Sequence, residues 1–253
     1  MTWRVVAASD VGTSHVANGA ACEDSCWAQV DVTAAGVPVL SMFVADGAGT
    51  AACGGEGAEL AMQAAAAFVG AKLKLPEFGI GDSLAVECVS AVRARIYAQA
   101  DDAGLTPRDY ACTFLGVIST PQASLVMQIG DGGVVVDAGS GLELAVVPMS
   151  GEYANMTHFV TEDDAITVMA TKVFAGPFLR AAAFSDGLQR LALNMATNTP
   201  HEPFFAPFFA VLGTATDAHE DELQSALVRF LAGPAVNERT DDDKTLALAV
   251  RFE

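Results

Sequence analysis

Carboxylate side chains follow apolar runs at four places in this sequence, each next to a glycine or another acidic residue. The four segments are Val44-Ala45-Asp46-Gly47, Gln128-Ile129-Gly130-Asp131-Gly132, Ala183-Phe184-Ser185-Asp186-Gly187 and Asp241-Asp242-Asp243-Lys244-Thr245, and a fifth acidic pair, Glu23-Asp24, precedes an apolar stretch. Carboxylate oxygens are the ligands that the hard cations Mg²⁺ and Mn²⁺ prefer. Aspartates at strand ends, brought together by a sheet, would therefore form a metal site.

Each acidic segment also has a plain structural explanation when it stands alone. Asp-Gly is a common turn dipeptide, and the segment at 241–245 could be a charged loop before an edge strand. However, Asp46 ends a run of seven apolar or small residues, and burying a carboxylate is costly unless a partner offsets its charge. The five segments together predict a metal-dependent hydrolytic site centred on Asp46.

Apolar patterns place these acidic residues at the ends of strands. We expect strands over 3–8, 26–32, 39–45, 112–119, 124–129, 134–137, 166–173, 181–184 and 245–252, and helices over 55–74, 84–103, 188–195, 204–212 and 220–231. Because no helix separates the three strands within 112–137, they should be antiparallel neighbours. Grouped helices and runs of strands predict an α+β fold in one domain over 1–253, with antiparallel sheets covered by segregated helices.

Composition narrows the classes of partner. The chain has 31 acidic residues against 13 lysines and arginines, a net charge of −18. This balance disfavours nucleic acid and anionic membranes, which bind basic surfaces, although the excess could also be a solvated acidic surface. No apolar run reaches the roughly 18–20 residues that span a bilayer, and the N-terminus lacks the apolar region of a secretion signal. We expect a soluble, cytoplasmic protein.

Taken together, the motifs resemble those of the protein phosphatase 2C family, the metal-dependent (PPM) serine/threonine phosphatases. The resemblance runs over nearly the whole chain. It rests on Glu23-Asp24, Val44-Ala45-Asp46-Gly47-Ala48-Gly49, Thr113-Phe114-Leu115, Gly130-Asp131-Gly132, Ser185-Asp186-Gly187 and Asp242-Asp243-Lys244-Thr245. A bacterial branch is more similar still, through Gly12-Thr13-Ser14-His15, Gly151-Glu152-Tyr153-Ala154-Asn155 and Asn237-Glu238-Arg239-Thr240-Asp241-Asp242-Asp243. The fold it implies is a four-layer α-β-β-α sandwich of two antiparallel sheets flanked by helix pairs.

The resemblance also implies roles for particular residues. By position, Asp46 would bridge two metal ions, and the carbonyl of Gly47 would contact the second ion. Asp186 and Asp242 would complete the first ion's site. Glu23 matches the acidic ligand of the second ion, a position that varies in the family.

Two further aspartates have implied roles outside that pair of ions. Asp24 would hold metal-bound water, and Asp131 matches the position linked to a third, looser ion in bacterial members. Asp243 falls where the family often has asparagine, so it ranks below Asp242. The resemblance implies two or three Mn²⁺ or Mg²⁺ ions and a water activated by two of them, which attacks phosphoserine or phosphothreonine. A phosphoprotein substrate, an opposing serine/threonine kinase and a monomeric enzyme are the partners and state we expect.

Two departures from the family pattern concern the residues that bind the substrate's phosphate. No arginine or lysine stands in residues 16–22, just before Glu23, where better-known members carry an arginine, and Ala48 replaces the histidine of eukaryotic members. His15 is the nearby ionisable side chain that could bind substrate, or it could only hydrogen-bond its own loop. A catalytically weak phosphatase-like module that regulates a partner kinase is therefore an alternative, and a small-molecule phosphatase is a third.

Other features have competing explanations. His158, His201 and His219 should be surface or satisfied histidines, and the phenylalanines at 204–209 should pack in the core or else form a partner-binding patch. The segment Gly151-Glu152-Tyr153-Ala154-Asn155 stands where the family has a mobile flap, and a structural turn is the alternative.

Overall fold

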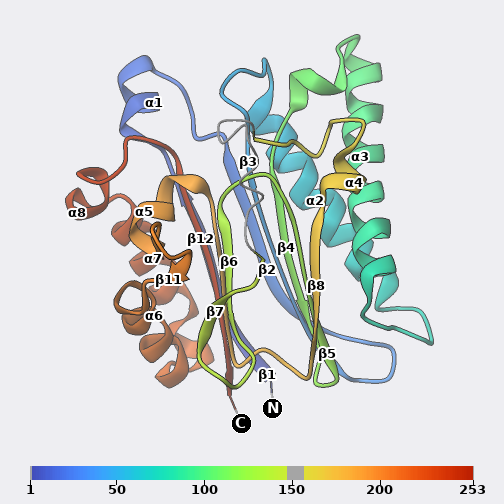
Figure 1. Ribbon diagram of the computed structural model, residues 1–253, viewed down its shortest axis with the longest axis vertical. Helices are drawn as coiled ribbons and strands as arrows, with labels where there is room; N and C mark the ends of the chain where they lie inside the picture. The colour runs from blue at the N-terminus through green and yellow to red at the C-terminus, as the bar shows by residue number, and fades with distance from the viewer. Residues whose placement is uncertain (1, 147–156, 253) are drawn as a thin grey trace.

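The computed structural model describes residues 2–146 and 157–252, and two five-stranded antiparallel sheets form its centre (Figure 1). The first sheet has the order β1 (Thr2–Asp10), β12 (Lys244–Phe252), β9 (Arg180–Phe184), β6 (Gly133–Asp137) and β7 (Leu142–Leu144). The second has the order β2 (Asp24–Val32), β3 (Pro38–Asp46), β4 (Phe114–Ser119), β5 (Ala123–Ile129) and β8 (Ala170–Ala175). A small hairpin pairs β10 (Leu193–Asn194) with β11 (Thr199–Pro200).

Helices cover the two outer faces. The long helices α2 (Gly54–Lys72) and α3 (Asp82–Ala103) lie on the second sheet, and α6 (Glu202–Thr214) and α7 (Glu220–Leu231) lie on the first (Figure 1). Shorter helical segments are α1 (Thr13–Asn18), η1 (Pro107–Tyr110), α4 (Ala165–Val168), η2 (Asp186–Leu188), α5 (Gln189–Ala192), η3 (Asp217–His219) and α8 (Pro234–Asn237). The predicted α+β fold with two antiparallel sheets and flanking helices is confirmed.

Three apolar clusters fill the spaces between these layers. One lies between the two sheets, and the other two lie between each sheet and its helices. Strand β3 contributes to two of them, since Met42 and Val44 face the other sheet while Phe43 and Ala45 face α2 and α3. Burial on both faces explains why residues 39–45 read as one continuous apolar run. Phe205 and Phe209 are buried in the cluster between the first sheet and its helices, which agrees with the prediction that the phenylalanines at 204–209 pack in the core.

The structure corrects the expectation that the strands within 112–137 are all neighbours. Strands β4 and β5 pair, but β6 belongs to the other sheet, between β9 and β7. The chain changes sheets at Gly130-Asp131-Gly132, where both glycines have left-handed backbone conformations, with φ of 94° and 91°. Two strands with no helix between them can lie in the same sheet or in two different sheets. The apolar pattern therefore does not show that the chain changes sheets here.

Smaller differences occur at short elements. Helix α1 lies between the expected strands at 3–8 and 26–32, where no helix was predicted, and the beginning of the expected strand at 166–173 is helical in α4. The expected helix at 188–195 ends at Ala192 and continues as strand β10. These elements are six residues or shorter, too short for an apolar period to mark them. Among the described residues, no helix is long and apolar enough to cross a membrane.

Candidate active site

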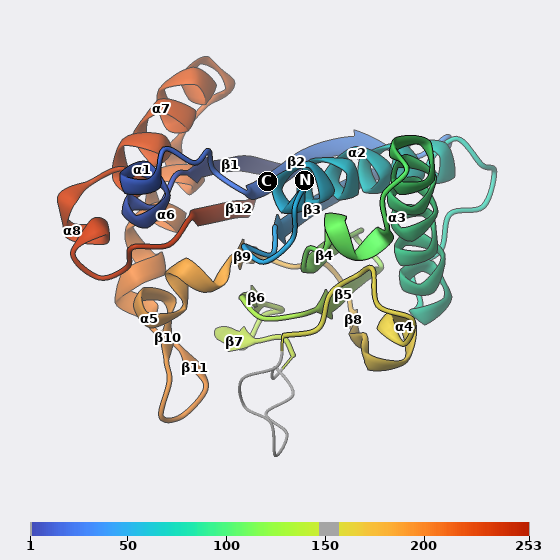
Figure 2. The ribbon, with the colours of Figure 1, turned by 90° about the horizontal axis from the view of Figure 1, so that it is seen from above.

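Strands β3 and β9 end on the side of the sandwich away from the two chain termini (Figure 1), and Figure 2 views the molecule from this end. A cavity of about 230 Å³ opens there. Its lining residues come from loops that are far apart in sequence. They are His15, Glu23, Asp46, Gly47, Ala48, Gly49, Thr113, Asp131, Thr157, Phe159, Asp186, Asp242 and Asp243. The structure thus brings seven of the eight predicted site residues to one cavity, and the eighth, Asp24, lies behind it.

Backbone hydrogen bonds fix the position of Asp46 at the end of β3. Its amide donates to Thr113 Oγ1 at 2.9 Å, and the Thr113 amide donates back to the Asp46 carbonyl at 2.8 Å. On the other side, the Gly47 amide donates to the Glu23 carbonyl at 3.1 Å. Asp46 is therefore held between the neighbouring segments on both sides of its strand.

Gly47 is required by close packing of two backbones. A Cβ atom at this position would lie 2.4 Å from the carbonyl carbon of Gly54, at the beginning of α2. No real Cβ tolerates such a contact, so the turn after Asp46 admits glycine alone. This approach brings the first turn of α2 against the strand end that carries Asp46.

Three carboxylates from different loops converge in the cavity. Asp46, Asp131 and Asp186 each offer an oxygen, and these oxygens lie within 4.8 Å of one another. Asp131 stands in the crossing between the sheets and accepts a hydrogen bond from Thr157 Oγ1 at 2.7 Å. Asp186 is the first residue of η2 and is separated from the end of β9 by Ser185 alone. Asp131 thus lies beside Asp46 and Asp186, and its assignment to a third ion stays a prediction.

Asp24 is buried behind Asp46, its direct partner in the β2–β3 register. Ser185 Oγ donates to Asp24 Oδ2 at 2.6 Å, and the Thr245 amide donates to Ser185 Oγ at 3.0 Å. This chain of hydrogen bonds links the ends of β2, β9 and β12 from inside the sandwich. The role implied for Asp24, holding metal-bound water, stays a prediction.

Asp243, which we ranked below Asp242 from the sequence, connects several loops through hydrogen bonds. It is 4% exposed and accepts from the amides of Gly12 and Glu23, both at 2.6 Å. Its Oδ2 also lies 3.0 Å from His15 Nδ1, and its own amide donates to Asp242 Oδ1 at 2.9 Å. Asp243 thus ties the loop before β2 to the loop before β12. The only signal in the sequence was its place in the run of three aspartates.

The cavity is strongly anionic. Six of its lining residues carry carboxyl groups, against one imidazole. Burial, followed by the charges of Asp24 and Asp186, raises the pKa of Asp46, and burial with Asp131 and Asp242 raises the pKa of Asp186. Such crowding is unfavourable at neutral pH unless cations offset the charge.

Unsatisfied oxygens test whether metal ions fit these residues. Glu23 Oε2, Asp24 Oδ1 and Asp186 Oδ1 are buried without a hydrogen-bond partner. Buried polar atoms normally have partners, and carboxylate oxygens in an anionic cavity are suited to hard divalent cations. The residues present therefore fit Mg²⁺ or Mn²⁺, although their individual roles as ligands stay predictions.

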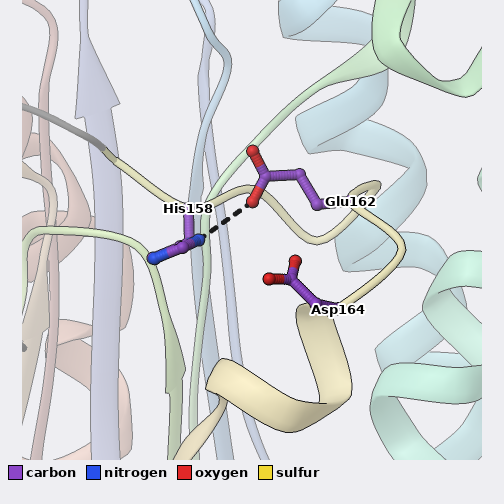
Figure 3. Close-up of side chains that lie close together, drawn as sticks. All are labelled: His158, Glu162 and Asp164. Atoms are coloured by element: carbon purple, nitrogen blue, oxygen red, sulfur yellow. Dashed lines mark hydrogen bonds and ion pairs between the residues drawn. The ribbon is translucent and has the colours of Figure 1, made fainter.

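The remaining histidines lie outside the cavity lining. His158 Nδ1 lies 3.0 Å from Glu162 Oε2, with Asp164 close to this pair (Figure 3). His219 Nδ1 accepts from the Thr216 amide at 3.1 Å, and His201 is exposed. All three fit the expectation of surface or satisfied histidines. The segment 151–155, with its predicted flap, lies outside the described residues.

Comparison with known proteins gives the family. The sequence profile described as "Protein phosphatase 2C" matches residues 11–232. The chain belongs to the protein phosphatase 2C family. It is also 54% identical to "Serine/threonine-protein phosphatase 3" of Escherichia coli (strain K12), over the full length of both chains. The family predicted from the motifs is confirmed, and with it a divalent-metal-dependent class of phosphatase.

Solved structures show the same protein phosphatase 2C fold at low sequence identity. The catalytic domain of the serine threonine protein phosphatase PstP, in complex with two manganese ions, superposes with a TM-score of 0.63, 16% identity and 99% of each chain covered. The S. agalactiae serine/threonine phosphatase gives a TM-score of 0.61 with 15% identity, covering 99% of this chain and 100% of that one. Thus the sandwich and its helix pairs are those of the family.

Proposed function

We propose that this protein is a Mn²⁺- or Mg²⁺-dependent phosphatase that hydrolyses phosphoserine and phosphothreonine in proteins. The observation that carries this proposal is the anionic cavity, whose crowded carboxylates include buried oxygens without partners. A phosphate dianion cannot enter such a cavity unless cations are bound there. The name of the E. coli relative, which covers the whole chain, supports a protein substrate.

Six residues would hold the ions in this proposal. Asp46 and the Gly47 carbonyl stand at the end of β3, Asp186 and Asp242 face them from the first sheet, and Glu23 lies alongside. Asp131 would share the ions of Asp46 and Asp186 or hold a third ion. When bound, the ions supply an activated water and offset the charge on the phosphoryl oxygens.

The protein's own residues position these groups. Thr113 and the Glu23 carbonyl fix the backbone at Asp46 and Gly47, and Ser185 orients Asp24. Because an ionised Asp243 only accepts hydrogen bonds, His15 Nδ1 donates to it. In the imidazolium form, Nε2–H of His15 is then left to donate to a phosphoryl oxygen. This is the contact we propose in place of the family arginine.

Hydrolysis of a phosphoserine peptide with and without Mn²⁺ tests the proposed activity. We expect phosphate release that depends on Mn²⁺ or Mg²⁺ and stops when EDTA removes the ions. The heat-denatured protein with the same metal serves as the control for metal-catalysed background. Full activity in EDTA would contradict the proposal.

Replacing His15 with alanine should weaken substrate binding. We expect KM for a phosphopeptide to rise about tenfold with a smaller change in kcat, because one charge-assisted hydrogen bond to phosphate is lost. Steady-state kinetics at saturating Mn²⁺ measure both constants. His201→Ala, which removes an exposed histidine outside the cavity, is the matched control. A His15→Ala protein with unchanged KM would assign His15 to loop structure only.

The second candidate function is a catalytically weak module that binds and regulates a partner kinase. The absence of a cationic side chain other than His15 among the cavity's lining residues favours it. Calorimetric titration with Mn²⁺ separates the two functions, since a module without metal chemistry need not bind the ion in the millimolar range. We further propose a single-domain monomer in the cytoplasm that opposes a serine/threonine kinase, consistent with the strongly acidic composition.

A further inference from the structure

A second, larger hollow of about 640 Å³ adjoins the candidate active site. It shares the side chain of Phe159 with the cavity, and Thr50 and Ala51 extend it from the cavity residues Ala48 and Gly49. Its lining residues are Thr50, Ala51, Tyr97, Thr106, Pro107, Arg108, Asp109, Ala111, Phe159, Thr161, Glu162 and Asp163. This groove, between η1 and the segment 159–163, is therefore continuous with the place where a phosphoryl group would be hydrolysed.

Helix α3 holds one wall of the groove in place. Arg93 donates to the carbonyl of Val160 at 2.5 Å and to that of Glu162, and Tyr97 Oη donates to the Thr161 carbonyl at 2.8 Å. The pair of His158 and Glu162 closes the same turn (Figure 3). These contacts join the wall to a long, packed helix, so the groove exists before any ligand binds.

The opposite wall is fixed in the same way and is joined to the active site. Thr106 and Asp109 form a reciprocal capping box at the beginning of η1. The Asp109 carbonyl accepts from the Cys53 amide at 2.7 Å, and the Ala111 carbonyl accepts from the Ala48 amide at 2.9 Å. The groove thus has a fixed position relative to Ala48, which follows Asp46 and Gly47 in the site. A ligand bound in the groove would have a defined distance to the metal-binding carboxylates.

The chemistry of the walls indicates what could bind. Phe159, Tyr97 and Pro107 supply apolar surface, while three carboxylates, on Asp109, Glu162 and Asp163, face one cation, Arg108. Asp109 is already engaged by Thr106, and Asp163 is exposed. The excess of negative charge favours a basic side chain, and the volume lies in the range of ligand-binding hollows.

We propose that this groove binds the polypeptide on one side of the phosphorylated residue and that a lysine or arginine of the substrate pairs with Asp163, the exposed carboxylate beside the His158–Glu162 pair. The inference rests on the proposed protein phosphatase activity. It adds a preference for substrates with a basic residue near the phosphoserine. In this proposal the groove binds the flanking polypeptide, and the metal site binds the phosphate.

Paired phosphopeptides test this preference. Each pair has the same phosphoserine and carries either arginine or glutamate at one position within three residues of it, on either side. For the wild-type protein with Mn²⁺ we expect kcat/KM to favour arginine about threefold to tenfold at one or more positions on one side, as befits an exposed ion pair. The ratio should shrink towards one in 0.5 M salt, because salt screens exposed charges.

Charge reversal at the groove completes the test. In Asp163→Lys the arginine-to-glutamate ratio should fall to about one or invert, whereas Glu222→Lys, the same change on exposed α7 of the other sheet, should keep the wild-type ratio. Comparison of each ratio within one protein sample removes differences in folded fraction. A wild type without the preference, or an Asp163→Lys protein that retains it, would overturn the groove proposal. Failure of the phosphatase proposal is distinguishable, since p-nitrophenyl phosphate would then not be hydrolysed with Mn²⁺ either.

Discussion

Replacing Asp46 with asparagine should reduce kcat/KM for a phosphopeptide by about a thousandfold or more and, at the same time, stabilise the metal-free protein at pH 8. The loss of activity follows from the removal of a carboxylate that lies within 4.8 Å of those of Asp131 and Asp186, and with it the ion binding that would stabilise the reacting phosphate. The gain in stability follows because burial, and after it the charges of Asp24 and Asp186, raise the pKa of Asp46, so that an ionised carboxylate is unfavourable at this position.

Both effects can be measured on the same purified protein. Steady-state kinetics with saturating Mn²⁺ give the activity, and thermal unfolding in EDTA at pH 8 gives the stability. Asp102→Asn, the same change at an exposed position of α3, controls for the loss of one negative charge from an acidic chain. Either an active Asp46→Asn protein, or one that is inactive and also less stable without metal, would contradict the role we propose for Asp46.

The metal-free protein should lose stability as the pH rises from about 4 to about 7. Burial raises the pKa of Asp186 from 3.8 to about 6. Burial is also the main reason that the pKa of Asp24 rises from 3.8 to about 7. A carboxyl group whose pKa is raised by folding stabilises the folded state below its unfolded pKa, and this contribution is lost as the pH passes through the folded pKa. We expect Tm in EDTA to fall by roughly 5 °C or more across this window.

Mn²⁺ should reverse this loss at neutral pH. An ion that binds only the folded protein stabilises it in proportion to the logarithm of its concentration above Kd. Thermal unfolding at pH 5, 6, 7 and 8, each in EDTA and in millimolar Mn²⁺, measures both trends. The gap between the two curves should widen as the pH rises, since metal ions compete with protons for the carboxylates. A metal-free Tm that is constant or rises over pH 4–7 would show that the cavity carboxylates are not crowded in solution.

Much of the fold and the site followed from the sequence because each signal was local. The apolar run that ends at Asp46 identified β3, and the strand ends before Asp131 and Asp186 placed their carboxylates in one cavity. The change of sheet at 130–132 was not predictable, because β6 joins the first sheet by pairing with β9, which lies far downstream in the chain. Likewise, the hydrogen bonds that Asp243 receives from Gly12 and Glu23 join segments more than 200 residues apart.

The groove beside the site was hidden for the same reason. Its two walls come from 106–111 and 159–163, and neither segment has a pattern that marks a binding surface. The anchoring arginine of one wall, Arg93, lies on α3, and in the sequence it is one ordinary charged residue of a helix. A site to which many loops each contribute one residue can be found only from the structure. Strand ends that carry an Asp-Gly motif can be found from the sequence.

The order of strands in the first sheet has a consequence for the protein's biosynthesis. Strand β12, the last along the chain, lies between β1, the first, and β9, and it pairs with both. Until the ribosome has released residues 244–252, β1 has no neighbour in its sheet and the loop with Asp242 and Asp243 cannot meet Glu23. A nascent chain that lacks residues 242–252 cannot complete the cavity, so we expect it to have no phosphatase activity.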